Sequence, residues 1–296
     1  MSEIFFKNLE KKLSKNNNNR VIIPLAADKA VKYAIEEALN KGFIKGAILV
    51  GCPKEIKDVF GEFAETKDIS ILEASSEIDA LEKSINEIKK SNANILMKGM
   101  CQSASLIKAV LNKNNGLEHG FMSHLTCFQL PDKDYFCILT DSAVNIAPDK
   151  ETLIKEIENA NKLFQKLEGD IPTVALLAAN EKVSDKMLST KLAEAVTQEL
   201  SNRNDMIVEG PVAFDLAVSS KSAQIKKYKG KLNGNANIFV APRIETSNAL
   251  YKSLQHYLKV DMGGILYGAS IPIIHSSRAD NAKTKYNSLL LGLATL

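Results

Sequence analysis

Compact apolar runs alternate with helical patterns along nearly the whole chain, and few architectures accommodate such a pattern. The first run is VIIPLA, residues 21–26. Asp28 follows it as an expected helix N-cap, and an apolar stripe of helical spacing then continues to Gly42. Uninterrupted apolar strands separated by helices are typical of parallel sheets covered by helices on both faces. The alternation therefore predicts an α/β fold with mostly parallel sheets. Further strands are expected at residues 47–51, 69–72, 94–99, 136–141, 173–179, 205–210, 237–242 and 264–268.

A long helix expected at residues 149–167 separates two halves of similar pattern. The 296 residues are enough for two domains of ordinary size. We expect two three-layer α/β domains, the first made of residues 1–146 plus 277–296 and the second of residues 147–276. In open parallel sheets, ligands bind at the carboxyl ends of the strands, so the residues directly after each strand are candidates for a site.

Charge and composition exclude several classes of protein. The 38 Lys and Arg residues are interspersed with 35 Asp and Glu residues, which gives no basic field of the kind that binds nucleic acid. No apolar run is long enough to cross a bilayer, and the first residues lack the apolar core of a signal peptide. The four cysteines form no CxxC pair, as is typical of reduced thiols. We expect a cytoplasmic protein that binds neither nucleic acid nor a membrane.

The segment NILMKGMCQSAS, residues 94–105, places polar groups at a strand exit. Lys98 and Gly99 leave the expected strand, and Ser103 lies at the start of a helix. A lysine, a glycine that lets the backbone approach a ligand, and a hydroxyl at a helix N-terminus together suit a phosphate group. A solvent-facing lysine beside a turn glycine explains the same residues equally well.

The segment IIHSSRADN, residues 273–281, predicts a strand, a tight polar turn and then a helix. Arg278 lies where the helix is expected to begin, and Ser276, Ser277 and Asp280 are available as helix caps. Unpaired N–H groups at such a helix start can bind an anion. On this stretch alone, a capped helix with a surface arginine is the favoured interpretation.

Serine and histidine residues near residue 120 do not form a convincing nucleophilic pair. Ser123 and His124 are adjacent, and neighbours on an extended strand point to opposite faces of the sheet. His119, His124 and Cys127 match no common zinc spacing, so no metal site is expected.

Polar residues also follow or precede strands in the second half of the pattern. Asp141 lies at a strand end, and Glu245 and Asn248 open a helix after another strand. Such residues cap helices as often as they contact ligands, and both interpretations stay open.

Seven segments, in their order and spacing, resemble the phosphate acetyl/butyryltransferase family. The resemblance spans nearly the whole chain, and the chain length is similar to that of the stand-alone butyryl branch. The segments are LMKGM, SHL, LTDSAVNIAPD, EGPVAFDLAVS, GNANIFVAPRIETSNALYKSL, GASIPIIHSSRAD and KYNSLLLGLA.

The resemblance implies two α/β domains like those of the isocitrate and isopropylmalate dehydrogenases, with an active site in the cleft between them. It implies reversible transfer of a short acyl group between coenzyme A and inorganic phosphate, by direct attack in a ternary complex. Coenzyme A would be a substrate, no cofactor would be tightly bound, and the protein would form a homodimer or larger homo-oligomer.

The resemblance also implies roles for individual residues. Arg278 with Lys98 would bind phosphate, Ser277 and Ser123 would donate to the oxyanion, and Asp280 would be the base. The further substrate-binding residues are Gly99, Ser103, Asp141, Glu245 and Asn248.

Three departures from the butyryl pattern keep alternatives open. They are Arg243 at a commonly acidic position, Thr246-Ser247 in place of Ala-Gly, and Glu118 near a usual arginine. A non-catalytic relative that binds coenzyme A or acyl phosphate is one alternative. A dehydrogenase of the same fold is an alternative that does not depend on these departures. It would use a nicotinamide cofactor and need clustered aspartates for a metal, and the sequence shows no such cluster. The choice between acetyl and butyryl groups also stays open.

Overall fold

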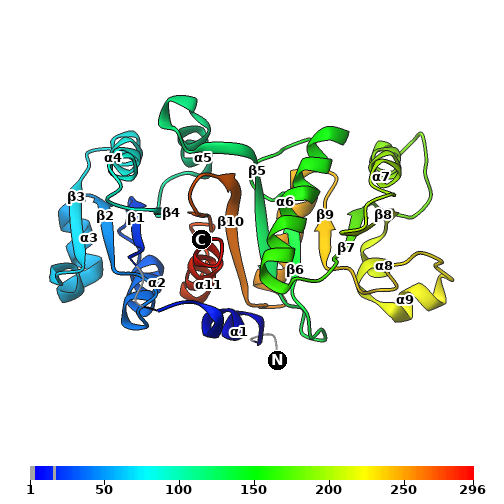
Figure 1. The fold of residues 1–296 in the computed structure, drawn as a ribbon, viewed down its shortest axis with the longest axis horizontal. Helices are drawn as coiled ribbons and strands as arrows, with labels where there is room; N and C mark the ends of the chain where they lie inside the picture. The colour runs from blue at the N-terminus through cyan, green and yellow to red at the C-terminus, as the bar shows by residue number, and fades with distance from the viewer. Residues whose placement is uncertain (1–3, 16–17) are drawn as a thin grey trace. The chain divides into compact units, whose positions relative to one another are not determined.

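Two compact units make up the chain (Figure 1). A computed structural model describes residues 4–15 and 18–296. The composite unit consists of the described residues as far as Met122 together with Asp261–Leu296, and the continuous unit is Ser123–Val260. Both units have mixed α/β structure with mostly parallel strands, as the alternating pattern predicted.

The observed division and the expected one differ in two stretches. Residues 123–146 belong to the continuous unit, and residues 261–276 belong to the composite unit. The boundary at residue 122 falls inside a strand, Glu118–Phe128, rather than at the long helix. Hydropathy identifies a strand but does not tell which unit that strand joins.

The composite unit has parallel strands in the order β3-β2-β1-β4-β11, followed by β10 antiparallel to β11. Its strands are β1 Arg20–Pro24, β2 Gly46–Gly51, β3 Ile69–Glu73, β4 Ile95–Met97, β10 Met262–Ala269 and β11 Ile273–Ile274. Its helices are α1 Ile4–Lys12, α2 Lys29–Asn40, α3 Pro53–Phe60, α4 Glu77–Lys89, α5 Ser103–Leu111 and α11 Ala282–Leu293, with 3-10 turns at Gly61–Glu65 and Lys113–Asn115.

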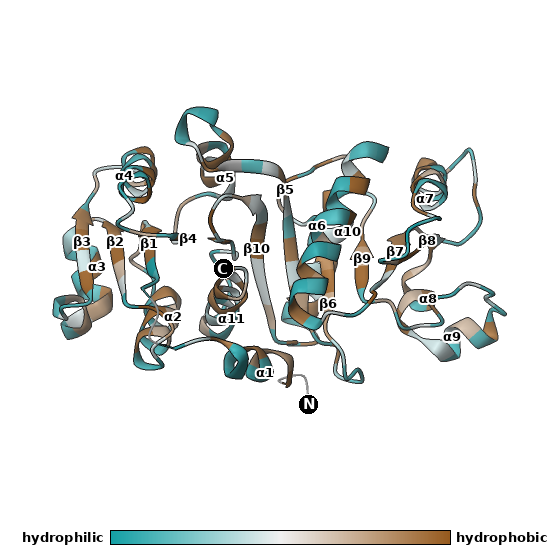
Figure 2. Ribbon diagram, viewed as in Figure 1, coloured by the Kyte–Doolittle hydropathy of each residue, from teal (hydrophilic) through white to brown (hydrophobic). Residues whose placement is uncertain are grey.

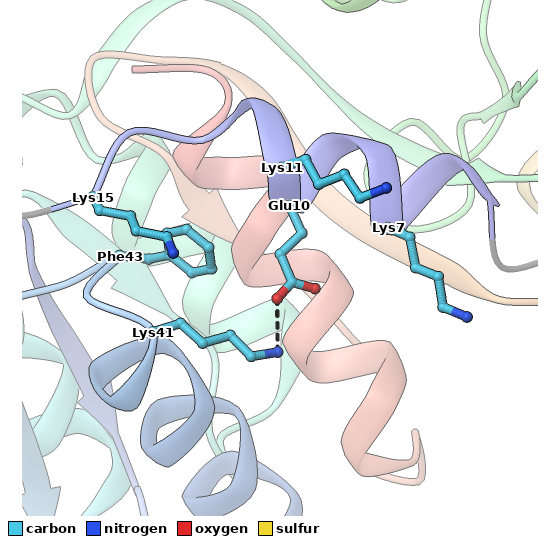
Figure 3. A pocket seen from close by; sticks show the side chains of 6 residues that line it. All are labelled: Lys7, Glu10, Lys11, Lys15, Lys41 and Phe43. Atoms are coloured by element: carbon cyan, nitrogen blue, oxygen red, sulfur yellow. Dashed lines mark ion pairs between the residues drawn. The ribbon is translucent and has the colours of Figure 1, made fainter.

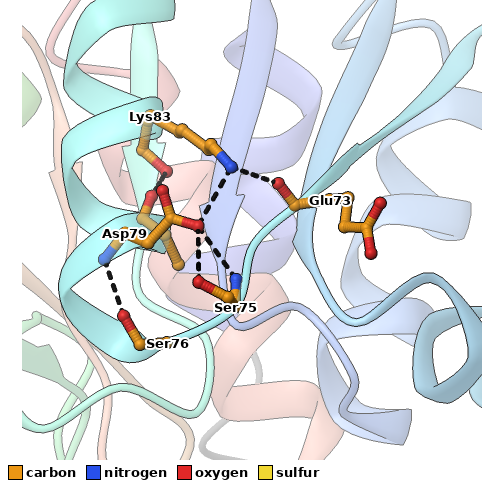
Figure 4. Close-up of polar contacts among 7 residues, drawn as sticks. Glu73, Ser75, Ser76, Asp79 and Lys83 are labelled. Carbon is orange, nitrogen blue, oxygen red and sulfur yellow. Dashed lines mark hydrogen bonds and ion pairs between the residues drawn. The ribbon is translucent and has the colours of Figure 1, made fainter.

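The connection between β3 and α4 shows how short polar residues start a helix (Figure 4). Ser76 is the N-cap, and its Oγ accepts a hydrogen bond from the N–H of Asp79 at 3.1 Å. The Asp79 carboxylate accepts from the N–H of Ser75 and from Lys83 Nζ, both at 2.9 Å. Because Lys83 also donates to the carbonyl of Glu73 at 2.8 Å, the first turn of α4 is tied to the end of β3.

The continuous unit has β5 antiparallel to β6, followed by β9, β7 and β8 in parallel. Its strands are β5 Glu118–Phe128, β6 Cys137–Thr140, β7 Thr173–Leu177, β8 Ile207–Val212 and β9 Ile238–Val240. Its helices are α6 Lys150–Glu168, α7 Leu188–Glu199, α8 Phe214–Val218, α9 Ser220–Ile225 and α10 Ile244–His256.

Most strand residues of both units are buried, although β3 is partly exposed beyond Ile69, and Figure 2 shows most strands in the colour of hydrophobic residues. Every predicted strand run overlaps an observed strand. Fully buried apolar strands leave the polar ends of the elements as the places where a ligand can bind. Over the described ranges, 4–15 and 18–296, no helix is both long and apolar enough to span a membrane.

Candidate active site

Lys98 leaves the carboxyl end of β4 and is almost completely buried. β4 lies between β1 and β11, and Lys98 is only 1% exposed. The interpretation of Lys98 as a solvent-facing lysine is therefore wrong. Burial is the main cause that lowers the pKa of Lys98, and the positive charges of Lys285 and Arg278 lower it further. Cys101 and Asp280 act in the opposite direction and raise it.

Gly99 is required by the backbone around it. A Cβ at this position would collide with the carbonyl oxygens of Pro24 and Leu25, at the end of β1. The next residue, Met100, donates its N–H to the Leu25 carbonyl at 2.8 Å, which holds the two chain segments together. The glycine therefore lets the β4 exit cross the β1 exit, whereas the sequence suggested an approach to a ligand.

The turn that carries Arg278 lies directly beside Lys98. The N–H of Lys98 donates to the carbonyl of Ile274 in β11 at 2.9 Å, so the turn after β11 begins next to the β4 exit. α11 begins only at Ala282, and its N-cap is Asn281, whose side chain accepts from the N–H of Thr284 at 2.8 Å.

The predicted helix start at Arg278 and the predicted caps Ser276, Ser277 and Asp280 are therefore wrong. The Asp280 carboxylate instead accepts a hydrogen bond from the N–H of Ser277 at 2.7 Å and closes a tight turn before the helix. Local propensity does not distinguish this turn from a cap, because the same residue types favour both.

Arg278 is exposed at the tip of this turn. No hydrogen bond or ion pair joins its guanidinium to another residue in the described part of the chain. Its donors are thus open to an anion, and a guanidinium can bind phosphate oxygens bidentately. The Ser276 hydroxyl is buried in the same turn and has no hydrogen-bond partner among the described residues.

Ser103 lies at the first position of α5, as expected, and contacts the same turn. Its Oγ lies 3.0 Å from Nε2 of the buried His275. This contact joins the start of α5 to the residue that follows β11. The composite unit thus brings together six of the predicted site residues, Lys98, Gly99, Ser103, Ser277, Arg278 and Asp280.

Sequence reasoning missed an ion pair beside these residues. Lys285, in the first turns of α11, is 0% exposed, and its Nζ lies 3.0 Å from Oδ2 of Asp28. Asp28 was expected to be the N-cap of α2, and this is confirmed by its bond from the N–H of Ala30 at 2.6 Å. A lysine at a position where the helix dipole disfavours a cation is the signal that could have identified Lys285.

The other four predicted residues lie in the continuous unit, where Asp141 has a structural role. Its carboxylate accepts hydrogen bonds from the N–H groups of His124, Ala143 and Val144 and from the side chain of Asn145, at 2.8 to 2.9 Å. These bonds fix the turn that follows β6. No helix begins at this turn, since α6 starts only at Lys150, so Asp141 is not a helix cap, and its contact with a ligand stays a prediction.

Ser123 and His124 point to different partners, as the alternation along a strand predicts. Ser123 Oγ accepts from Asn159 Nδ2 at 3.0 Å, whereas Nδ1 of His124 lies 3.5 Å from the hydroxyl of Thr126, two residues further along β5. Ser123 is completely buried.

The start of α10 presents exposed polar residues. Glu245 and Asn248 are exposed, and Asn248 donates to the Ser142 carbonyl at 3.3 Å. Arg243 occupies the N-cap position without a side-chain cap bond, and its side chain is exposed. The side chain of Glu118, another departure from the family pattern, lies outside the described part of the structure.

Glu156, in α6, is a buried carboxyl that no motif indicated. Burial is the main cause that raises its pKa to about 9, and the nearby charge of Asp141 contributes. The folded state therefore holds the Glu156 proton more tightly than the unfolded state does. The protonated carboxyl contributes to the stability of the fold, and this contribution is fully present at pH values below the ordinary carboxyl pKa. It is lost as the pH rises toward 9.

We expect Glu156→Gln to remove this loss. At pH 8 the variant should be more stable than the parent protein by about 2 kcal/mol, and the two should converge near pH 5. Urea unfolding at pH 5, 7 and 8 measures the difference. Glu151→Gln, an exposed position in the first turn of the same helix, is the control. Parallel pH profiles for the parent and Glu156→Gln would contradict the assignment.

A hollow of about 520 Å³ elsewhere on the composite unit is lined by charged side chains (Figure 3). Lys41 at its edge forms an ion pair with Glu10 at 2.7 Å. None of the predicted site residues lines it; the lining residues are Lys7, Glu10, Lys11, Lys15, Lys41 and Phe43. Within residues 4–15 and 18–296, no three His, Cys, Asp or Glu side chains come together as a metal site would require.

Comparison with known proteins connects this geometry to a family. The family model described as phosphate acetyl/butaryl transferase matches residues 64–293. The probable phosphate butyryltransferase of Bacillus subtilis (strain 168) is 34% identical over 97% of this chain and 96% of its own length. The phosphate butyryltransferase of Clostridium acetobutylicum has the same identity and coverage.

A solved structure agrees with these relatives. The crystal structure of a branched-chain phosphotransacylase from Enterococcus faecalis V583 is 30% identical and superposes with a TM-score of 0.81, over 93% of this chain and 98% of that one. The family model matches most of the chain, and the relatives align with nearly all of it. The chain therefore belongs to the phosphate acetyl/butaryl transferase family.

Proposed function

We propose that this protein is a phosphate acyltransferase that reversibly moves an acyl group between coenzyme A and inorganic phosphate. The relatives' names support this reaction, acyl-CoA + phosphate = acyl phosphate + CoA. The observation that carries the proposal is the pair of cations at the β4 and β11 exits. Lys98 is buried, while the exposed Arg278 has no partner among the described residues.

The two cations suit the two requirements of phosphate binding. Arg278 presents a planar set of donors that can grip two phosphate oxygens, and Lys98 supplies a charge in a site shielded from water. Bound phosphate would be favoured because its negative charge offsets the repulsion between Lys98 and its cationic neighbours. These residues would hold phosphate as nucleophile in one direction and stabilise it as leaving group in the other.

In the direction of acyl phosphate formation, a phosphate oxygen attacks the thioester carbonyl carbon. The tetrahedral intermediate collapses as the C–S bond breaks, and the coenzyme A thiolate takes up a proton. Ser277 and Ser276, whose hydroxyl has no hydrogen-bond partner among the described residues, are the oxyanion donors we assign in the composite unit, and Ser123 is a further candidate. Asp280, buried and bonded to the Ser277 N–H, is our candidate for the proton-transfer group.

Direct attack fits the chemistry of the nearby cysteine. Cys101 is buried next to Lys98, and its burial raises the pKa of the thiol to about 11. A thiol that stays protonated near neutral pH is a poor nucleophile, so a covalent acyl-cysteine step is disfavoured. We therefore propose a ternary complex in which both substrates are bound together, with no tightly bound cofactor.

Assembly and finer architecture complete the proposal. We propose two three-layer α/β domains of the isocitrate and isopropylmalate dehydrogenase type, a homodimer or larger homo-oligomer, and a cytoplasmic location. Gly99, Ser103, Asp141, Glu245 and Asn248 remain proposed substrate-binding residues. Gly99 and Asp141 would act through the backbone they shape, because each is engaged with surrounding main chain.

Thiol release from a series of acyl-CoA substrates with phosphate tests the reaction. We expect phosphate-dependent release with acetyl-, propionyl-, butyryl- or isobutyryl-CoA, and the rates across the series give the chain-length preference. Two results would overturn the proposal. If the protein binds coenzyme A but turns over none of the four acyl-CoA substrates, it is better explained as a non-catalytic relative. Arg243 and Thr246-Ser247, which depart from the butyryl pattern, motivate this alternative. Metal-dependent reduction of a nicotinamide cofactor would favour a dehydrogenase.

A further inference from the structure

Lys285 is placed where a lysine is unfavourable for folding. It is completely buried, and it lies in the N-terminal part of α11, four residues after the N-cap Asn281. Removing an ammonium group from water is costly, and the positive end of the helix dipole repels a cation at this end of a helix. Its ion pair with Asp28 at 3.0 Å offsets only part of this penalty.

The fold alone gives no reason to keep a charge at this position. Every residue of α11 from Thr284 to Leu293 is buried. A buried ion pair can often be replaced by apolar side chains of similar volume with little loss of stability. A methionine or leucine at residue 285 would therefore pack as well against its surroundings.

Among the described residues, two other cations lie close enough to Lys98 to affect it. Lys98 interacts electrostatically with two other cations, Lys285 and Arg278, and with the carboxylate of Asp280, while Asp28 pairs with Lys285. Both carboxylates are also engaged with main-chain N–H groups, Asp28 at the start of α2 and Asp280 in the Ser277 turn. An anion bound at the turn would relieve the excess of positive charge.

We propose that Lys285, held by Asp28, is a positioning residue that sets the affinity of the site for phosphate. This inference rests on the proposed acyl transfer. Lys285 contributes a fixed positive charge behind Lys98 and Arg278, and its ion pair joins the start of α11 to the start of α2. The residues that precede α11, including Ser277, Arg278 and Asp280, are thereby held beside the Lys98 exit.

Lys285→Met tests the proposal, because methionine nearly preserves volume and removes only the charge. We expect the KM for phosphate to rise about tenfold or more in the acyl phosphate direction, with the KM for acyl-CoA changed less than twofold. In the reverse direction the KM for acyl phosphate should rise, and the KM for coenzyme A should not. The thermal stabilisation that phosphate gives to the parent should also shrink in the variant.

A second lysine on the same helix is the matched control. Lys283 lies two residues earlier and also pairs with an aspartate, Asp261, at 2.8 Å, but its side chain is 46% exposed. Lys283→Met should leave both KM values within twofold of the parent. If the Lys285→Met protein does not fold, the double variant Asp28→Asn/Lys285→Met replaces it. Asparagine at residue 28 can still cap α2, and the double variant leaves no unpaired charge in the interior.

The outcomes separate the two proposals. If the parent turns over no acyl-CoA, the proposed function fails. The thermal stabilisation by phosphate can still be compared among the parent, Lys285→Met and Lys283→Met. If the parent is active and folded Lys285→Met keeps its KM for phosphate within twofold, the role of Lys285 is refuted. An equal rise of both KM values, or a fall in kcat alone, would also refute it, because a purely structural role would produce such a change.

Discussion

Arg278→Ala is expected to leave the fold intact and to lower kcat/KM by about 10²–10³-fold, because it removes the exposed donor for the phosphate group. The guanidinium makes no hydrogen bond or ion pair with another described residue, so its removal leaves no buried group unpaired. The thermal unfolding midpoint should therefore stay within about 1–2 °C of the parent. Initial rates with varied phosphate and a thermal melt measure both effects.

Two further variants sharpen this expectation. Arg278→Lys keeps the charge but loses the planar pair of donors, and it should recover only part of the rate. Arg243, in the other unit, is also an exposed arginine, at the N-cap position of α10. A loss in Arg243→Ala that equals the loss in Arg278→Ala, or near-normal rates in Arg278→Ala, would remove Arg278 from its role as the phosphate ligand.

Gly99→Ala is expected to destabilise the protein by about 3 kcal/mol or more. The added methyl group would meet the carbonyl oxygens of Pro24 and Leu25, and main-chain atoms in a buried crossing have little freedom to move. Urea unfolding of the parent and the variant gives the difference. A folded fraction of Gly99→Ala should also lose activity, because the same crossing positions Lys98.

Gly120 provides the control for the effect of an added methyl group. A Cβ at Gly120 would meet only the carbonyl oxygen of Gly268, at 3.9 Å, which is an ordinary contact. Gly120→Ala should therefore change stability by less than about 1 kcal/mol. Similar stabilities of Gly99→Ala and the parent would mean that the β1 and β4 exits separate more easily than the structure implies.

Local periodicity predicted the regular elements well. Strand runs such as VIIPLA and the stripe that follows it correspond to β1 and α2, with Asp28 capping the helix as expected. These features depend on contacts between residues that are close in sequence, and the hydrophobic pattern reports such contacts directly. The segment 94–105 likewise led to Lys98 at a strand exit and Ser103 at a helix start.

Features that depend on distant residues were not predictable in the same way. The burial of Lys98 comes from β11 and its turn, which are far along the chain. The partner of Lys285 is Asp28, near the opposite end of the chain. The sequence predicted a helix after the turn at residues 275–281, but elements on several sides bury almost the entire helix. A single-sequence pattern predicts one apolar face, and it does not count how many neighbours a helix will have.

The interrupted course of the composite unit has a consequence for synthesis on the ribosome. Residues 123–260 emerge as one uninterrupted stretch, and β11 and α11 emerge after it. Only then can β4 pair with β11. We expect a nascent chain whose residue 260 has just left the ribosome to contain a folded continuous unit without the turn that carries Arg278. Catalytic competence would therefore require Asp261–Leu296 to have emerged as well.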